Sequence, residues 1–108
     1  MLDLDITFSD TCKVWVSKTR WYFVQVPAEN TEEIRYFSSN MLAKKRGFGA
    51  VKVTANINDV SWQTSIFPSF KSERFENMQY LLFLKAEVRK RAKISEGDAV
   101  KVSLNIQL

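Results

Sequence analysis

Two eight-residue stretches of this chain are nearly identical, and both have the pattern of a β-strand. Residues 50–57 read AVKVTANI, and residues 99–106 read AVKVSLNI. Apolar residues occupy most alternate positions, which predicts strands with one buried and one solvent-facing side. If the match reflects a duplication, the fold consists of two related halves around a pseudo-twofold axis, with any binding surface where they meet. The alternative is that two unrelated strands use the same few β-favouring residues.

Each copy follows a strand and a helix, so each half has the order strand, short helix, strand. In the first half the strand is the aromatic-rich run 21–26, and Asn30 with Glu33 forms a capping box at the start of the helix. In the second half the apolar run 80–84 is short enough to be buried on both faces, and residues 85–93 form the helix.

The remaining segments complete a mainly β domain. Further strands are expected at residues 2–8, 13–16 and 60–66, the last of which follows a tight turn at residues 58–59 and ends at Pro68. Residues 71–79 are expected to form the longest loop. We therefore predict one domain, residues 1–108, with two short α-helices and a closed or nearly closed β-barrel, because closure removes exposed strand edges.

The absence of histidine restricts the chemistry of the chain. With no histidine and one cysteine, Cys12, it cannot build the usual zinc or copper sites or a histidine-dependent triad, so we expect no metal and no cofactor. A Lys85 or Tyr80 base stays open, but the sequence has no recognisable paired carboxylates or activated nucleophile. These observations favour a non-enzymatic protein in which Cys12 is a packing residue or a loop thiol.

The sequence also favours a cytoplasmic location. The first residues lack the basic and apolar regions of a signal peptide, and no stretch reaches membrane-spanning length. A single cysteine excludes an internal disulfide, which fits a reducing compartment.

One hypothesis for function is a binding module for a small anionic ligand. Trp62, Thr64, Ser65 and Phe67 gather aromatic and hydroxyl groups on one segment. Beside cationic side chains, such a segment could hold an anionic or planar ligand. The alternative places Trp62 in the core, because it alternates in phase with apolar neighbours. The candidate ligand-binding residues are Arg46, Trp62, Ser65, Lys85 and Arg89.

Residues 82–102, LFLKAEVRKRAKISEGDAVKV, resemble the swapped-hairpin element of AbrB-type transition-state regulators and MazE-type antitoxins. Residues 24–29, VQVPAE, are a looser copy in the first half. Over its whole length the chain is similar to a small prokaryotic family of uncharacterised proteins, through RGFG at 46–49, WQTSIFP at 62–68 and LKAEVR at 84–89. These resemblances imply a double-split β-barrel built from two pseudo-symmetric strand-helix-strand units, and no established activity.

The regulators bind DNA, so the resemblance makes nucleic-acid binding the alternative hypothesis. A net charge of +4 supports it, as does the Arg89-Lys90 pair at the position of a basic pair in the regulators. The chain departs from their pattern at Leu81 and Phe23, where they carry an arginine, and at Tyr36 in the first half. The candidate nucleic-acid-binding residues are Lys44, Lys45, Arg46, Arg89, Lys90, Arg91 and Lys93.

The partner and the oligomeric state stay open. A protein partner could add a strand to an exposed edge at residues 13–16. An internal pseudo-dimer has little need of a second chain, so we expect a monomer or a weak homodimer, with no membrane partner.

Overall fold

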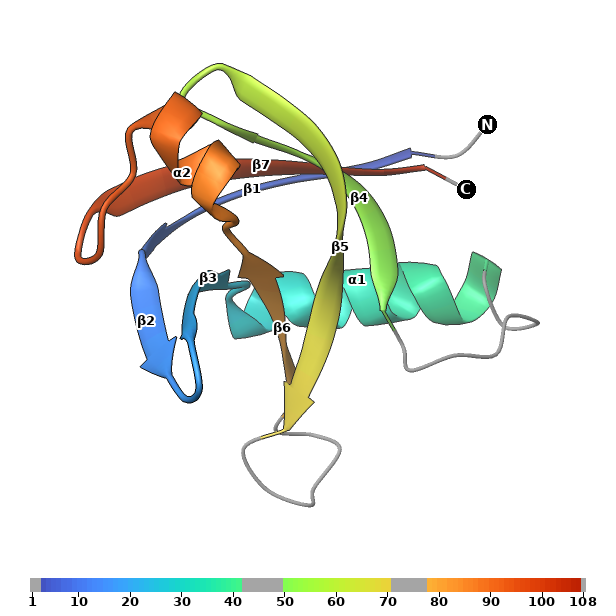
Figure 1. Ribbon diagram of the computed structural model, residues 1–108. Coiled ribbons are helices and arrows are strands. Elements are labelled where there is room, and N and C mark those ends of the chain that lie inside the picture. Colours follow the sequence, from blue (N-terminus) through green and yellow to red (C-terminus); the bar gives the residue numbers. More distant parts are fainter. Residues whose placement is uncertain (1–2, 42–49, 71–77, 108) are drawn as a thin grey trace.

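The computed structural model describes residues 3–41, 50–70 and 78–107, and these residues form a curled antiparallel sheet with two helices (Figure 1). The sheet has seven strands in the order β1-β7-β4-β5-β6-β3-β2 and curls into a half-barrel. In chain order the elements are β1 (Asp3–Thr11), β2 (Lys13–Val16), β3 (Arg20–Gln25), α1 (Ala28–Met41), β4 (Val51–Ile57), β5 (Val60–Phe70), β6 (Met78–Phe83), α2 (Ala86–Ala92) and β7 (Ala99–Gln107).

The two repeated stretches form β4 and β7, and these strands are neighbours in the sheet. Ala55 lies opposite Leu104, and both side chains are buried. The pairs on either side join Thr54 to Asn105 and Asn56 to Ser103. The prediction of strands with alternating burial is confirmed for both stretches.

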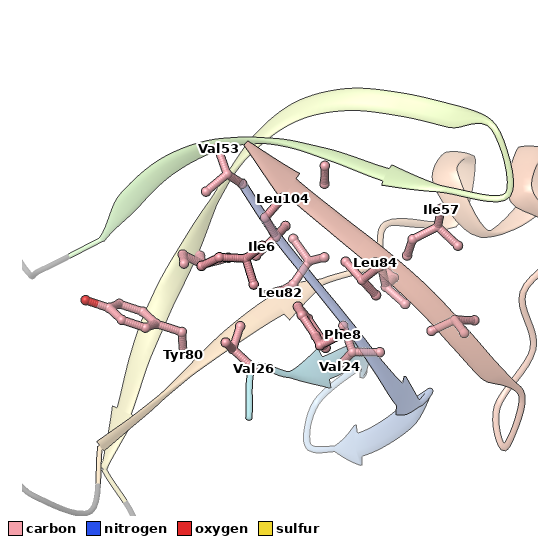
Figure 2. Close-up of a cluster of buried hydrophobic side chains, with 14 of the residues drawn as sticks. Ile6, Phe8, Val24, Val26, Val53, Ile57, Tyr80, Leu82, Leu84 and Leu104 are labelled. Atoms are coloured by element: carbon pink, nitrogen blue, oxygen red, sulfur yellow. The ribbon is translucent and has the colours of Figure 1, made fainter. Parts of the chain in front are cut away.

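The core lies inside the curl of the sheet, and Figure 2 shows its side chains converging from many strands. Val24, Leu82 and Leu104 are at most 1% exposed there. Helix α1 lies across the curl (Figure 1) and contributes the fully buried Ile34. The hydroxyl of Thr31 donates to the carbonyl of Val26 at 3.3 Å, which fixes the first turns of α1 to the end of β3.

The edge strands β1 and β2 leave the barrel open, and one carboxylate spans the seam between β1 and the end of β3. Oδ2 of Asp10 on β1 accepts a hydrogen bond from the backbone N–H of Gln25 on β3 at 2.8 Å. The ammonium of Lys13 lies 2.6 Å from the same oxygen. Side-chain contacts therefore replace a backbone ladder where the half-barrel comes closest to closing.

Two short turns have the backbone geometry that their residues favour. Asn58 and Asp59, between β4 and β5, have φ values of 50° and 66°, the left-handed region of a tight hairpin turn. Between α2 and β7, the Asp98 carboxylate accepts the N–H of Ser95 at 2.8 Å, and Gly97 supplies a φ of 90°. The turn predicted at residues 58–59 is confirmed.

Three details of the sequence-based prediction are wrong. Helix α1 begins at Ala28, so Asn30 lies inside its first turn and is not the N-cap. Strand β5 continues through Pro68 to Phe70. Among the described residues, the pairing of β4 with β5 ends at Val51 and Ile66. Pro68 therefore has no partner on β4, and its missing N–H costs no hydrogen bond on that side. In β6 only alternate residues are buried, so this strand is not covered on both faces.

Candidate functional site

The outer face of the sheet, opposite the core, is aromatic over β3, β6 and β5. Phe23 pairs with Phe83 across the β3–β6 ladder, and their ring centroids are 6.2 Å apart. Phe83 also contacts Trp21, with 5.7 Å between centroids in an edge-to-face arrangement, and Phe67, at 6.0 Å. Trp21 and Phe67 are 45% and 43% exposed, so this aromatic cluster is open to solvent.

The other half of the outer face is polar. Over β4, β7 and β1 it carries Thr54, Asn105 and Asp5, and the Asn105 amide donates to the Asp5 carboxylate at 2.6 Å. The change from polar to aromatic surface follows from which strands pair, because residues on one face align across the ladder. The apolar half is where a ligand would gain most from burial.

An open groove of about 760 Å³ lies beside the aromatic cluster, where β3, β5 and β6 meet the start of α2. Its floor is aromatic, with Trp21, Phe67 and Phe83. Polar groups come from β5. The cationic side chains come from β3, β4, the connection between β6 and α2, and α2 itself. The lining residues are Thr19, Arg20, Trp21, Tyr22, Lys52, Gln63, Thr64, Ser65, Phe67, Phe83, Leu84, Lys85, Ala86 and Arg89.

Arg89 is held in place at the groove by the elements around it. Its Nε–H donates to the carbonyl of Leu84 at 3.0 Å. Its guanidinium carbon lies 3.5 Å from the ring centroid of Tyr22, a cation–π contact. A side chain already held by two contacts loses little rotamer freedom when it binds an anion.

The groove is strongly cationic. Arg20, Lys52, Lys85 and Arg89 line it, and none of the described lining residues is acidic. Within residues 3–41, 50–70 and 78–107, the ion pairs join Lys13 to Asp10 and Arg35 to Glu32, so the four groove cations have no carboxylate partner there. Their combined field favours an anion.

The structure brings together three of the five predicted ligand-binding residues. Ser65, Lys85 and Arg89 line the groove, whereas Trp62 lies on the opposite face of β5 and packs against the core. Arg46 lies outside the described residues, as do Lys44 and Lys45. Sequence reasoning did not select Arg20, Trp21, Lys52 or Phe83 as site residues. Lys52 carried a signal, because it alternates with Val51 and Val53, whereas Trp21 and Phe83 stand in apolar runs whose phase the sequence does not show.

The basic residues of α2 do not all share one side of the helix. Arg89, Lys90 and Lys93 line a shallow depression of about 370 Å³ next to the groove, together with Ala86, Ile94 and Ser95. Arg91 is exposed but does not line it. Ala86, Arg89, Lys90 and Lys93 are spaced three or four residues apart, which places them on one face of the helix.

The two residues considered for catalysis lie in different parts of the molecule. Tyr80 is only 4% exposed, and burial raises the pKa of its hydroxyl, with the charge of Arg35 opposing that rise. It lies inside the curl, whereas Lys85 lines the groove on the outer face. Within the described ranges, no group of three or more Cys, Asp or Glu side chains gathers that could hold a metal ion. No helix in the same ranges is long and apolar enough to cross a bilayer.

Comparison with known proteins places the chain in a family. A model of the family described as Domain of unknown function (DUF1905) matches residues 8–104, which include the whole groove. The chain belongs to this family. No curated protein matches the chain. Family membership therefore supplies no activity, and the groove's chemistry has to be interpreted from its own residues.

Proposed function

We propose that this DUF1905 protein is a non-enzymatic binding module whose groove holds a small organic anion with a planar, apolar body. The proposal rests on two features that occur together in one groove. Its floor is aromatic and exposed, and its four cations have no carboxylate partner among the residues that the structure describes. An aromatic floor favours a flat apolar group, and the cations favour a negative charge at its edge.

The proposed ligand lies with its ring against Trp21 and Phe67 and its anionic group towards Arg89. The guanidinium can bind a carboxylate or phosphate through two parallel N–H bonds, and its contacts with Leu84 and Tyr22 hold it in position. Gln63 and Ser65, on the β5 side of the groove, supply hydrogen-bonding groups for the polar edge of the ring. This arrangement binds and orients a ligand without requiring a proton transfer.

Calorimetric titration with adenosine monophosphate tests this proposal, because that probe has both a planar ring and an anion. Adenosine and inorganic phosphate each carry one of the two features. We expect the monophosphate to bind more tightly than either. A protein that binds none of the three, or binds phosphate as tightly as the nucleotide, contradicts the proposal.

Variants then locate the binding. Lys52→Gln and Lys85→Gln should each weaken nucleotide binding about two- to fivefold, the effect of one exposed charge contact. Lys101→Gln is the matched control, because it removes an exposed cation from the polar half of the same outer face. Equal losses in all three variants would indicate a general effect of net charge and not binding in the groove.

A second candidate function is binding of duplex DNA in the manner of AbrB-type regulators. It is supported by Arg89, Lys90 and Lys93, which line one depression on α2. Duplex binding through these phosphate contacts should weaken steeply with salt. Failure of the protein to retain random duplex DNA at low ionic strength would remove this candidate.

We also infer that the fold arose by duplication as a double-split barrel. The repeated strands support this, because residue n in β4 corresponds to residue n + 49 in β7. A twofold axis through the Ala55–Leu104 pair exchanges the Thr54–Asn105 pair with the Asn56–Ser103 pair. The same exchange relates the β4–β5 pairing to the β7–β1 pairing. By this correspondence, the β3–β6 region that forms the groove floor lies where the halves meet a second time.

A further inference from the structure

We propose that the binding surface extends from the groove onto the β2–β3 hairpin and accommodates a single-stranded nucleic acid. This inference rests on the proposed function, because the groove would hold one nucleotide of the strand. It adds a second stacking position outside the groove and so names the class of ligand.

The second position is Trp15. On the β2–β3 ladder Trp15 lies directly opposite Trp21, and directly opposed residues project from the same face of a sheet. Trp15 is 58% exposed and does not line the groove, whereas Trp21 does. From β2 to β5 the outer face therefore presents Trp15, Trp21, Phe83 and Phe67 in strand order. Successive bases of a single strand can stack on such a series, because every base has an aromatic face.

The charges around this surface suit a sugar-phosphate backbone. Arg20 and the exposed Lys18 lie at the hairpin end, and Lys52 and Lys85 lie at the groove. On β1, Asp3 and Asp5 lie over the polar half of the outer face, and Asp10 at the seam is paired with Lys13. Cations therefore follow the aromatic half of the outer face, which is the combination found in single-strand binding surfaces.

Other occupants satisfy fewer of these features. A duplex offers phosphates but keeps its base faces stacked internally, which would leave Trp15 and Trp21 uncovered. A second copy of the chain would bring another net charge of +4 against a cationic surface. An acidic peptide meets the charges, but its carboxylates do not stack on rings. A single strand carries both the anions and the exposed planar groups.

Fluorescence anisotropy with an end-labelled thymidine strand of about ten nucleotides, a length within the range of single-strand sites, tests the inference. Competition with unlabelled thymidine monophosphate gives the affinity for one nucleotide. We expect the strand to bind far more tightly than the monophosphate and to quench tryptophan fluorescence. The ratio of the two affinities measures the contribution of the surface beyond the groove.

Trp15→Ala should lower that ratio about five- to hundredfold, the effect of losing one stacked base. Trp15→Phe should restore most of the ratio, because phenylalanine keeps an aromatic face. If it does, the loss in Trp15→Ala is not caused by misfolding of β2. Tyr36→Ala, which removes an exposed aromatic ring from α1, is the matched control and should leave the ratio unchanged.

The outcomes separate the two proposals. If the monophosphate binds in the groove but the strand binds no more tightly, or if Trp15→Ala leaves the ratio unchanged, the single-strand inference is overturned and the groove proposal stands. If poly-glutamate displaces the strand as well as unlabelled thymidine strand does, the surface recognises negative charge alone, and the inference is again overturned. If neither nucleotide nor strand binds, both proposals fail.

Discussion

At the scale of single residues, the surroundings of Asp10 at the seam lower the pKa of its carboxyl. Burial alone would raise the pKa of its carboxyl, but the N–H of Gln25 and the ammonium of Lys13 more than offset that effect. The pKa of Asp10 is therefore held below its ordinary value of 3.8. The ionised carboxylate is thus the form that joins β1 to β3.

This shift predicts an acid-sensitive contribution to stability. Because the pKa is lower in the folded protein, the contribution is complete above 3.8 and is lost as the pH falls through the folded-state value. Asp10→Asn should lower the free energy of unfolding at neutral pH by about 1–3 kcal/mol and flatten its decline below pH 3.8. Urea unfolding of both proteins at neutral pH and below pH 3.8 measures the two free energies.

Glu32→Gln is the control for a general loss of negative charge. Glu32 pairs with Arg35 at 3.3 Å, but its side chain is 72% exposed. Its removal should change the free energy of unfolding by less than about 1 kcal/mol. Equal effects of the two substitutions would show that Asp10 has no special role at the seam.

At the scale of elements, the β4–β5 hairpin is connected to α2 through its turn. Asn58 has a positive φ, and its side-chain amide donates to the carbonyl of Ala92 at 2.8 Å. Ala92 is the last residue of α2, where carbonyls lack partners within the helix. One residue therefore both shapes the turn and satisfies the helix end.

Substitutions at Asn58 should separate these two roles. Asn58→Gly keeps the positive φ but loses the bond to Ala92, so we expect it to cost about 0.5–1.5 kcal/mol. Asn58→Ala loses the same bond but, unlike glycine, has a β-carbon in the left-handed region, so it should cost about 1–2 kcal/mol more than Asn58→Gly. Chemical denaturation of both variants measures the difference.

Asp59→Gly is the matched control, because it relieves the second positive φ without touching the bond to α2. It should leave the free energy of unfolding unchanged or raise it. If Asn58→Gly is as stable as Asp59→Gly, which gains the same relief at a positive φ, the bond to Ala92 contributes nothing.

At the scale of the whole molecule, the sequence predicts local structure better than it predicts the site. Alternation of apolar residues was sufficient to predict β4 and β7 as strands, because one face of each strand is buried along its whole length. The groove depends on the pairing of β3 with β6 and of β6 with β5, which joins residues far apart in the chain. The apolar run 80–84 could not reveal that Phe83 faces outward, since its neighbours on both sides are also apolar.

Strand phase explains the different outcomes for Trp62 and Ser65. Both lie on β5, but their separation by three residues places them on opposite faces of the strand. Trp62 was a candidate for ligand binding, with a place in the core as the alternative that its phase supported, and it packs against the core. The predicted turn at residues 58–59 fixes the register that places Lys52 opposite Ser65, but Lys85 and Arg89 reach the groove through the β5–β6 pairing, which the sequence does not specify.

Cys12 offers a measure of how the whole half-barrel opens. It is 1% exposed, its N–H donates to the carbonyl of Asp98 at 2.8 Å, and its own carbonyl accepts the N–H of Gly97 at 2.9 Å. Burial raises the pKa of its thiol, although the charge of Arg89 opposes that rise. A disulfide reagent therefore needs both exposure and ionisation of a group that the fold keeps covered and protonated.

We expect the native protein to react with such a reagent at least about a thousandfold more slowly than the unfolded chain, because only opened molecules expose the thiol. Absorbance of the released thiolate measures the rate, and guanidinium-unfolded protein, which has one thiol per chain, gives the reference. Asp10→Asn should accelerate the native reaction, since β1 leads directly into Cys12 and the variant weakens the seam beside it. If the native thiol reacts as fast as the unfolded one, the core around Cys12 is not closed in solution. If Asp10→Asn leaves the rate unchanged while Asn58→Ala raises it, the opening that exposes Cys12 begins at the hairpin turn and not at the seam.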